Sequence, residues 1–130
     1  MKRLIAILFI VFLLIGVSVT EELLLHHTID NVNSSSSEIL SLIDESEDTI
    51  NTEEISSSLE NLKTFWNDEE KNLCFFTSYE KIKNMDESIA KLYYAIKNND
   101  RSLAIENVAC IQNYSNFLHY IMGFNLNNLF

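Results

Sequence analysis

Two cysteines, Cys74 and Cys110, are the side chains of this 130-residue chain best suited to covalent chemistry. They form no C-x-x-C motif, so nothing indicates thiol–disulfide catalysis. If the helices that carry them form a hairpin turning near Asn98, facing residues have numbers that add up to about 197, and the two thiols lie about 20 Å apart along the helices. A disulfide needs Cα atoms within about 7 Å of each other. We therefore predict two buried or semi-buried free thiols, with a bridge between two chains as the alternative.

The three histidines and the acidic stretch 44–54 are the candidates for metal binding. Zinc ligands usually recur three or four residues apart on a helix, whereas His26 and His27 are adjacent and His119 lies far along the chain. The acids from Asp44 to Glu54 lack the spacing and the glycine of a calcium loop. We predict no metal and no cofactor, and we interpret the acidic stretch as a solvated turn.

The sequence also lacks the motifs of known enzyme classes. With only two glycines, it contains no phosphate loop, nucleophile elbow or dinucleotide fingerprint. An active site would need at least a polar pocket around Tyr79, Glu80 and His119. We therefore predict that the protein is not an enzyme.

The N-terminal segment has the pattern of a membrane anchor. A basic pair, Lys2 and Arg3, precedes an apolar run over residues 4–19 that only Gly16 and Ser18 interrupt. As a helix the run would be about 24 Å long, slightly less than a hydrocarbon layer of about 30 Å. We predict an anchor over residues 1–20, represented by Leu4, Phe9, Phe12, Leu14 and Val19. The alternative is a signal segment cleaved at the small residues Gly16-Val17-Ser18.

The distribution of charge predicts where the remainder of the chain lies. Basic residues that flank a span stay in the cytoplasm, so Lys2 and Arg3 predict an extracytoplasmic domain over residues 21–130, held at the plasma membrane by a single span. That domain has seven basic residues against nineteen acidic ones, a formal net charge of −12. Such a charge repels phosphate backbones, which excludes nucleic acid as a partner.

Apolar residues at steps of three and four predict helices throughout this domain. The absence of proline and the scarcity of glycine allow those helices to be long. A first stripe comprises Leu25, Ile29, Val32, Ser36, Ile39, Ile43, Ser46 and Ile50. A second comprises Ile55, Leu59, Leu62, Trp66, Leu73, Phe76, Ile82, Met85, Ile89, Leu92 and Ile96, and a third Ala104, Val108, Ile111, Leu118 and Met122. The predicted fold is all-α: an N-terminal transmembrane helix followed by an antiparallel bundle of about three long helices.

The boundaries of these helices follow from capping residues. Thr52, followed by two glutamates, predicts a capped helix start after the acidic turn, and Asp100 predicts another after the run of asparagines. We expect the last helix to end near Gly123.

The second stripe is long enough for one helix of about forty residues or for two abutting helices. An unbroken helix, paired with the first across a turn near Asn51, would push residues 84–98 about 20 Å into the lipid. That stretch contains charged side chains, so this arrangement is untenable. Either the second helix bends between Leu73 and Tyr79, or the anchor and the first helix are not collinear. We prefer a kink at residues 33–37, where serine and asparagine are poor helix formers.

Four aromatic residues in the second stripe predict an interaction surface. Phe65, Trp66, Phe75 and Phe76 supply more apolar area than one thin hairpin can cover. The first functional hypothesis is therefore a non-enzymatic accessory subunit of the cell envelope that packs against a multi-span membrane protein or against itself. The alternative is an exterior sensor or ligand-binding domain that acts through a membrane partner.

Several short motifs resemble a family of short bacterial membrane proteins, domain of unknown function 4363 (DUF4363). They are Trp66 in Leu62-Lys63-Thr64-Phe65-Trp66, the stretch 76–82, the run Asn98-Asn99-Asp100-Arg101-Ser102-Leu103-Ala104, and the terminal Asn125-Leu126-Asn127-Asn128-Leu129-Phe130. The resemblance implies an anchored, exterior helical domain with no established activity, and a multi-span membrane protein as a candidate partner. A His and a Glu that the family tends to place in the second helix are replaced here by Tyr79 and Lys81. The resemblance therefore implies no proton or metal role for that pair.

Overall fold

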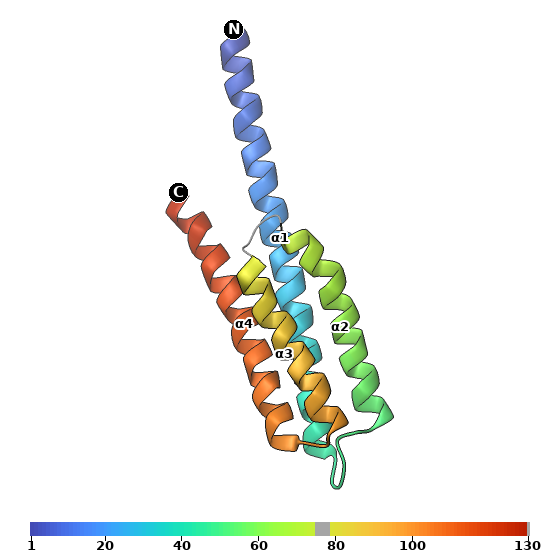
Figure 1. Ribbon diagram of the computed structural model, residues 1–130. Helices are drawn as coiled ribbons and strands as arrows, with labels where there is room; N and C mark the ends of the chain where they lie inside the picture. The colour runs from blue at the N-terminus through green and yellow to red at the C-terminus, as the bar shows by residue number, and fades with distance from the viewer. Residues whose placement is uncertain (75–78, 130) are drawn as a thin grey trace.

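The protein is an all-α bundle with one helix that projects far beyond it, as the sequence predicts. The computed structural model describes the backbone of residues 1–74 and 79–129, and the side chains of these residues except 119 and 121–129. Four helices make up the described chain: α1 (Lys2–Glu45), α2 (Glu53–Leu73), α3 (Tyr79–Lys97) and α4 (Arg101–Leu129). Figure 1 shows that α1 is far longer than its partners and that only its second half packs in the bundle.

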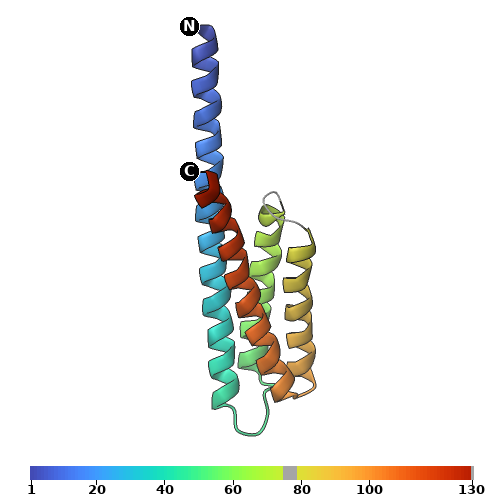
Figure 2. The same cartoon turned by 90° about the vertical axis from the view of Figure 1, so that its left-hand side faces the viewer.

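The four helices alternate in direction and form a ring. α1 packs against α2 and α4, and α3 packs against the same two helices, whereas neither diagonal pair is in contact. Two side-chain pairs define how α1 and α4 are aligned: Asn33 with Asn116, and Ser37 with Gln112. In both pairs the residue numbers add up to 149, so the end of α4 lies level with residue 20 of α1. Figure 2 shows the C-terminal end of α4 at that height, and Figure 1 shows that α4 diverges from α1 toward this end.

The core is built from the predicted stripes. Every described apolar member of the three stripes is buried, and Trp66, Ile39, Ile43, Leu62 and Met85 are among the largest side chains with almost no exposed surface. Phe76 and Met122 lie outside the described side chains. Ile50 is buried as well, although it lies in the loop after α1 rather than on the helix.

The predicted kink at residues 33–37 is wrong, because α1 is an uninterrupted helix from the apolar segment into the bundle. Three of its polar side chains there form hydrogen bonds without breaking the helix, although the Oδ1 atom of Asn33 is buried without a partner. The Ser36 hydroxyl donates to the carbonyl oxygen of Val32 at 2.5 Å, and the Asn33 and Ser37 side chains bond to side chains of α4. Tertiary packing thereby outweighs the low helix propensity of the segment.

The break lies in the second stripe instead, which was the other option that the geometry allowed. α2 ends at Leu73 and α3 begins at Tyr79, so the stripe forms two antiparallel helices. The expected end of the last helix near Gly123 is also wrong, since α4 continues to Leu129. One glycine inside a helix costs only about 1 kcal/mol, which does not by itself end it.

At the far end of the bundle, away from the N-terminus, hydrogen bonds hold the α1–α2 loop against the residues where α4 begins. The hydroxyl of Thr52 accepts the N–H of Ile55, and a carboxylate oxygen of Asp100 accepts the N–H of Leu103, so both predicted N-caps are confirmed. Asn99 adopts a left-handed conformation with φ of 54°, and its side-chain oxygen accepts the N–H of Ile50 at 2.8 Å. The α1–α2 loop and the α3–α4 turn are thus bonded to each other.

Candidate functional site

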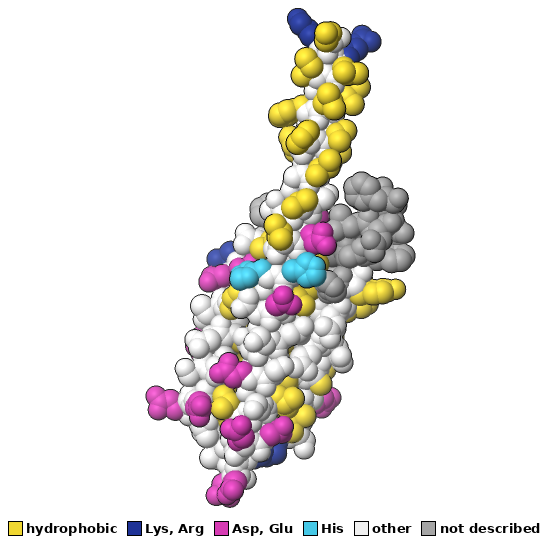
Figure 3. Space-filling model, turned by 180° about the vertical axis from the view of Figure 1, so that it is seen from behind, with side chains coloured by type: hydrophobic (Ala, Val, Ile, Leu, Met, Phe, Trp, Pro, Cys, Tyr) yellow, Lys and Arg dark blue, Asp and Glu magenta, His cyan; other side chains and the backbone are white. Residues whose placement is uncertain are grey.

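The first twenty residues of α1 project from the bundle as an isolated apolar helix. Figure 3 shows apolar side chains around this helix and basic ones at its tip, with acidic and histidine side chains beginning where the bundle begins. The residues predicted to represent the anchor are between 50 and 77% exposed: Leu4, Phe9, Phe12, Leu14 and Val19. By length and composition the helix could cross a membrane, although a signal sequence near an N-terminus has the same properties. Glu21, the first acid after the apolar run, is half-buried, and this burial raises its pKa.

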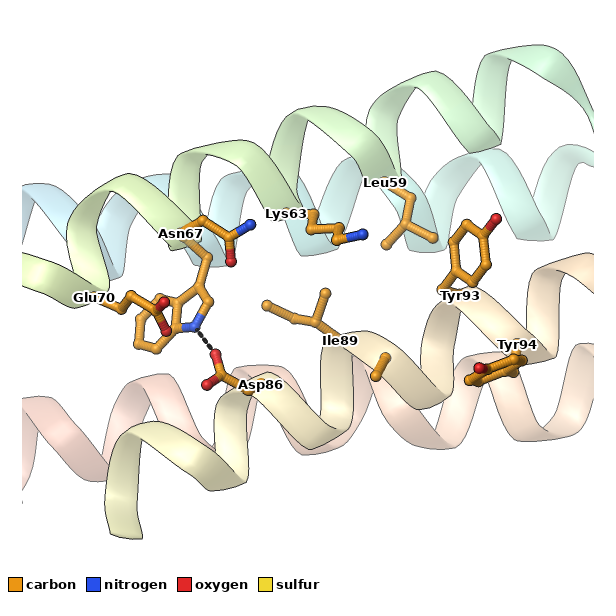
Figure 4. A pocket seen from close by; sticks show the side chains of 10 residues that line it. Leu59, Lys63, Asn67, Glu70, Asp86, Ile89, Tyr93 and Tyr94 are labelled. Carbon is orange, nitrogen blue, oxygen red and sulfur yellow. Dashed lines mark hydrogen bonds between the residues drawn. The ribbon is translucent and has the colours of Figure 1, made fainter. Parts of the chain in front are cut away.

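The second feature is a cleft of about 360 Å³ between α2 and α3. These two helices form the loosest of the four seams in the bundle. Figure 4 shows side chains from both helices around the cleft, with an indole and a carboxyl group at one end and two tyrosines at the other. Its lining is mixed and includes Leu59, Lys63, Asn67, Ile89 and Ala90 in the middle.

At the first end of the cleft, Trp66 and two carboxyl groups form a small polar cluster. The Trp66 indole Nε1–H donates to Asp86 Oδ1 at 2.5 Å, which satisfies the polar atom of an otherwise buried ring. Burial raises the pKa of the Glu70 carboxyl, and a hydrogen bond to Asp86 and the negative charge of Asp86 raise this pKa further; the charge of Lys71 acts in the opposite direction.

At the other end, two lysines flank the ring of Tyr93. The ammonium nitrogens of Lys63 and Lys97 each lie 5.7 Å from the ring centroid, within the range of cation–π attraction. The Tyr94 ring is 6.0 Å from that of Tyr93, with the planes at 79°. A neighbouring hollow of about 480 Å³ continues the cleft past Tyr93 toward Glu53 and the α1–α2 loop. The first end of the seam thus carries two carboxyl groups, whereas the other carries two lysines together with Glu53 and Glu60.

The expected aromatic interaction surface is not assembled as predicted. Trp66 is only 1% exposed, because α2 packs this face into a four-helix core rather than a thin hairpin. Phe65 is half-buried, and its ring lies edge-on to that of His27 with centroids 5.9 Å apart. Phe75 and Phe76 lie outside the described residues. Sequence patterns missed the cleft, since no spacing rule links Glu70 on one helix to Asp86 on the next.

The residues first considered for chemistry lie apart from one another. Both cysteines are free thiols, and Cys110 is half-buried as predicted. The predicted burial of Cys74 is wrong, because this residue is exposed where α2 ends. Among the described side chains, no three His, Cys, Asp or Glu residues are placed to hold a metal ion. Tyr79 and Glu80 are exposed at the start of α3, and the side chain of His119, the third member of the minimal active site, lies outside the described part.

A family model, domain of unknown function DUF4363, matches residues 21–129. The chain belongs to the DUF4363 family. The match begins where the apolar run ends and covers the whole bundle, so the DUF4363 domain and the folded unit coincide. No curated protein and no solved structure matches the chain.

The structure gives a physical reason for one of the motifs that carry the DUF4363 likeness. In the run from Asn98 to Ala104, Asn99 and Arg101 bond to the loop after α1, Asp100 caps α4, and Ala104 is buried. The motif therefore closes the far end of the bundle.

Proposed function

We propose that this DUF4363 protein is a non-enzymatic accessory subunit of the cell envelope, held at the membrane by α1 with its bundle on the extracytoplasmic side. The exposed apolar half of α1 carries the proposal. A row of large apolar side chains without any protein contact is unstable in water, because burial is worth about 25 cal/mol for each Å² of apolar surface. Lipid is a solvent in which such a helix is stable.

The proposed orientation rests on charge. Lys2 and Arg3 stand at the tip of the apolar helix, and the bundle at its other end has a formal net charge of −12. Positively charged flanks are retained in the cytoplasm, so the tip lies inside and the bundle outside. An accessory role is supported by the described side chains, whose polar groups serve caps, loops and helix contacts rather than a reactive cluster.

Alkaline extraction of membranes and thiol labelling test the anchor and its direction. We expect the full chain to stay in the membrane pellet at high pH and a chain without residues 2–20 to leave it. In a Cys110→Ala variant, exposed Cys74 is the single remaining thiol. A membrane-impermeant maleimide should label it in intact cells. Labelling only after permeabilisation would show that the bundle lies on the cytoplasmic side. Release of the full chain from the membranes at high pH would refute the anchor.

The accessory role needs a partner, either a multi-span membrane protein or a second copy. Crosslinking of the tagged full chain in intact membranes, followed by purification, should return a defined covalent complex. Recovery of monomer alone would contradict the role. A chain without residues 2–20 is the matched control, because it keeps the bundle and removes the tether.

The α2–α3 cleft favours a second candidate function, an exterior domain that binds a small ligand. A thermal-shift screen of the full chain in detergent would identify compounds that raise its melting temperature. Ala90→Phe should abolish such a shift, because Ala90 is exposed and lines the cleft. Ala109→Phe, at an exposed alanine of α4, is the matched control and should leave the shift intact. A screen without hits would count against this candidate.

A further inference from the structure

The distribution of charge along α4 is unlike that of its neighbours. Acidic and basic residues recur along the whole of α2 and α3, whereas no Asp, Glu, Lys or Arg follows Glu106. The stretch 121–130 contains six apolar residues, namely Ile121, Met122, Phe124, Leu126, Leu129 and Phe130. A solvent-exposed helix end on an acidic protein would ordinarily carry charge, so another environment must account for this composition.

The end of α4 lies at the base of the projecting helix. Because facing residues of α1 and α4 have numbers that add up to 149, residue 129 is level with Thr20 and residue 125 is about 6 Å further from the apolar run. Figures 1 and 2 both show that α4 extends past the ends of α2 and α3 on this side of the bundle. Figure 1 also shows that α4 diverges from α1 toward its C-terminal end, so its last turns project beyond the packed part of the bundle.

Exposed apolar side chains gather at this same end of the bundle. Leu23 on α1 is 67% exposed, Tyr120 near the end of α4 is 69% exposed, and Tyr79 at the start of α3 is 73% exposed. The acids of the α1–α2 loop, by contrast, lie at the opposite end. Tyrosine is enriched where a membrane protein meets the headgroup layer, because its ring is apolar and its hydroxyl can stay hydrated.

We infer that the C-terminal end of α4 is a second membrane contact, lying in the headgroup layer of the leaflet from which α1 emerges. This inference rests on the proposed anchor. The headgroup layer extends roughly 5–7 Å beyond the hydrocarbon on each side, which spans the heights of residues 125–129. Lipid, rather than a second copy, is the occupant because the uncharged end is level with the base of the apolar helix. The bundle is thus seated on the membrane by two helices.

Fluorescent probes on two matched asparagines of α4 test this placement. In a full chain carrying Cys74→Ser and Cys110→Ala, either Asn128→Cys or Asn113→Cys is labelled with an environment-sensitive dye and reconstituted in phosphatidylcholine vesicles. Residue 113 is exposed and about 24 Å beyond the level of Thr20, whereas residue 128 is within about 2 Å of that level. Nitroxide on the lipid headgroups should quench the dye at residue 128 and leave the dye at residue 113 bright. Leu23→Cys is the positive control.

The possible outcomes distinguish failure of the second membrane contact from failure of the anchor. If the labelled chain floats with vesicles and Leu23→Cys is quenched while Asn128→Cys is not, the second contact is refuted and the anchor stands. A blue-shifted but unquenched dye at residue 128 would assign the surface to a second copy and equally refute the lipid contact. A chain that does not float with vesicles overturns the anchor and this inference with it. Helical content by circular dichroism confirms that each labelled chain is folded.

Discussion

Replacing Arg101 should loosen the far end of the bundle. Its guanidinium donates to the carbonyl oxygens of Ile43 and Ser46, both at 2.5 Å, and approaches that of Glu47 at 3.5 Å. These carbonyls belong to the last turn of α1 and the residues after it, where the helix dipole favours a cation. The Ile43 carbonyl also accepts the backbone N–H of Ser46 at 3.2 Å. The Arg101 side chain at the start of α4 therefore caps the end of α1 and holds the loop that connects α1 with α2.

The expected effect of Arg101→Met follows from those bonds. A hydrogen bond from a charged donor contributes about 1.5–3 kcal/mol to stability. Because the site is half-buried, water can hydrate the carbonyl oxygens that lose Arg101, so we expect a net destabilisation of about 2 kcal/mol. In a domain of this size that corresponds to a fall in melting temperature of about 8 °C. Thermal unfolding followed by circular dichroism measures it.

Arg101→Lys is the informative control, because it keeps the charge and loses the planar fork that reaches two carbonyls at once. We expect its melting temperature to lie between those of the original protein and Arg101→Met. Equal melting temperatures for Arg101→Met and the original protein would refute this capping role and leave Arg101 a solvated surface residue.

Three smaller perturbations test other parts of the fold. Glu70→Gln should raise stability at neutral pH and have no effect in acid. The pKa of Glu70 is raised in the folded state, so the stability that its carboxyl group contributes is present below an ordinary carboxyl pKa and is lost as pH rises through the folded-state pKa. Thermal unfolding over a series of pH values measures this, with Glu60→Gln, on an exposed part of the same helix, as the control. Asn99→Ala should cost about 1–2 kcal/mol in a urea titration, since alanine disfavours positive φ and cannot accept the loop N–H, and a loss no greater than that of Asn98→Ala would contradict this role. Ser36→Leu should cost about 1–3 kcal/mol by overpacking, whereas Ser36→Ala should be nearly neutral.

The core and the caps could be predicted because each depends on local pattern. The spacing of Ile39 and Ile43, or of Leu59 and Leu62, determines a helix face whatever lies opposite, and all four are buried. Thr52 and Asp100 act on N–H groups three residues away, so their roles follow from the immediate sequence. Comparing the lengths of the two paired helices also predicted a break in either the first or the second helix.

The choice between those breaks could not be predicted, since it depends on contacts between helices. Residues 33–37 look poor for a helix in isolation, yet Asn33 and Ser37 face α4 and bond to it. The cleft escaped prediction for the same reason. Glu70 and Asp86 come together only because α2 and α3 pack loosely side by side, and periodicity within one helix carries no information on the tightness of a seam.

The continuity of α1 has a mechanical consequence for any function at the membrane. Sharp helix bends occur at proline, at glycine pairs or where the backbone ladder is interrupted, and α1 has neither glycine nor proline after Gly16. The apolar segment and the first bundle helix must therefore tilt together, unlike a domain joined to its anchor by a flexible linker. Because side chains of α4 bond to Asn33 and Ser37 of α1, the same tilt would set how close the end of α4 comes to the lipid in the proposed arrangement. A partner that binds the bundle would thus act on the direction of the span, and a partner that binds the span would act on the bundle.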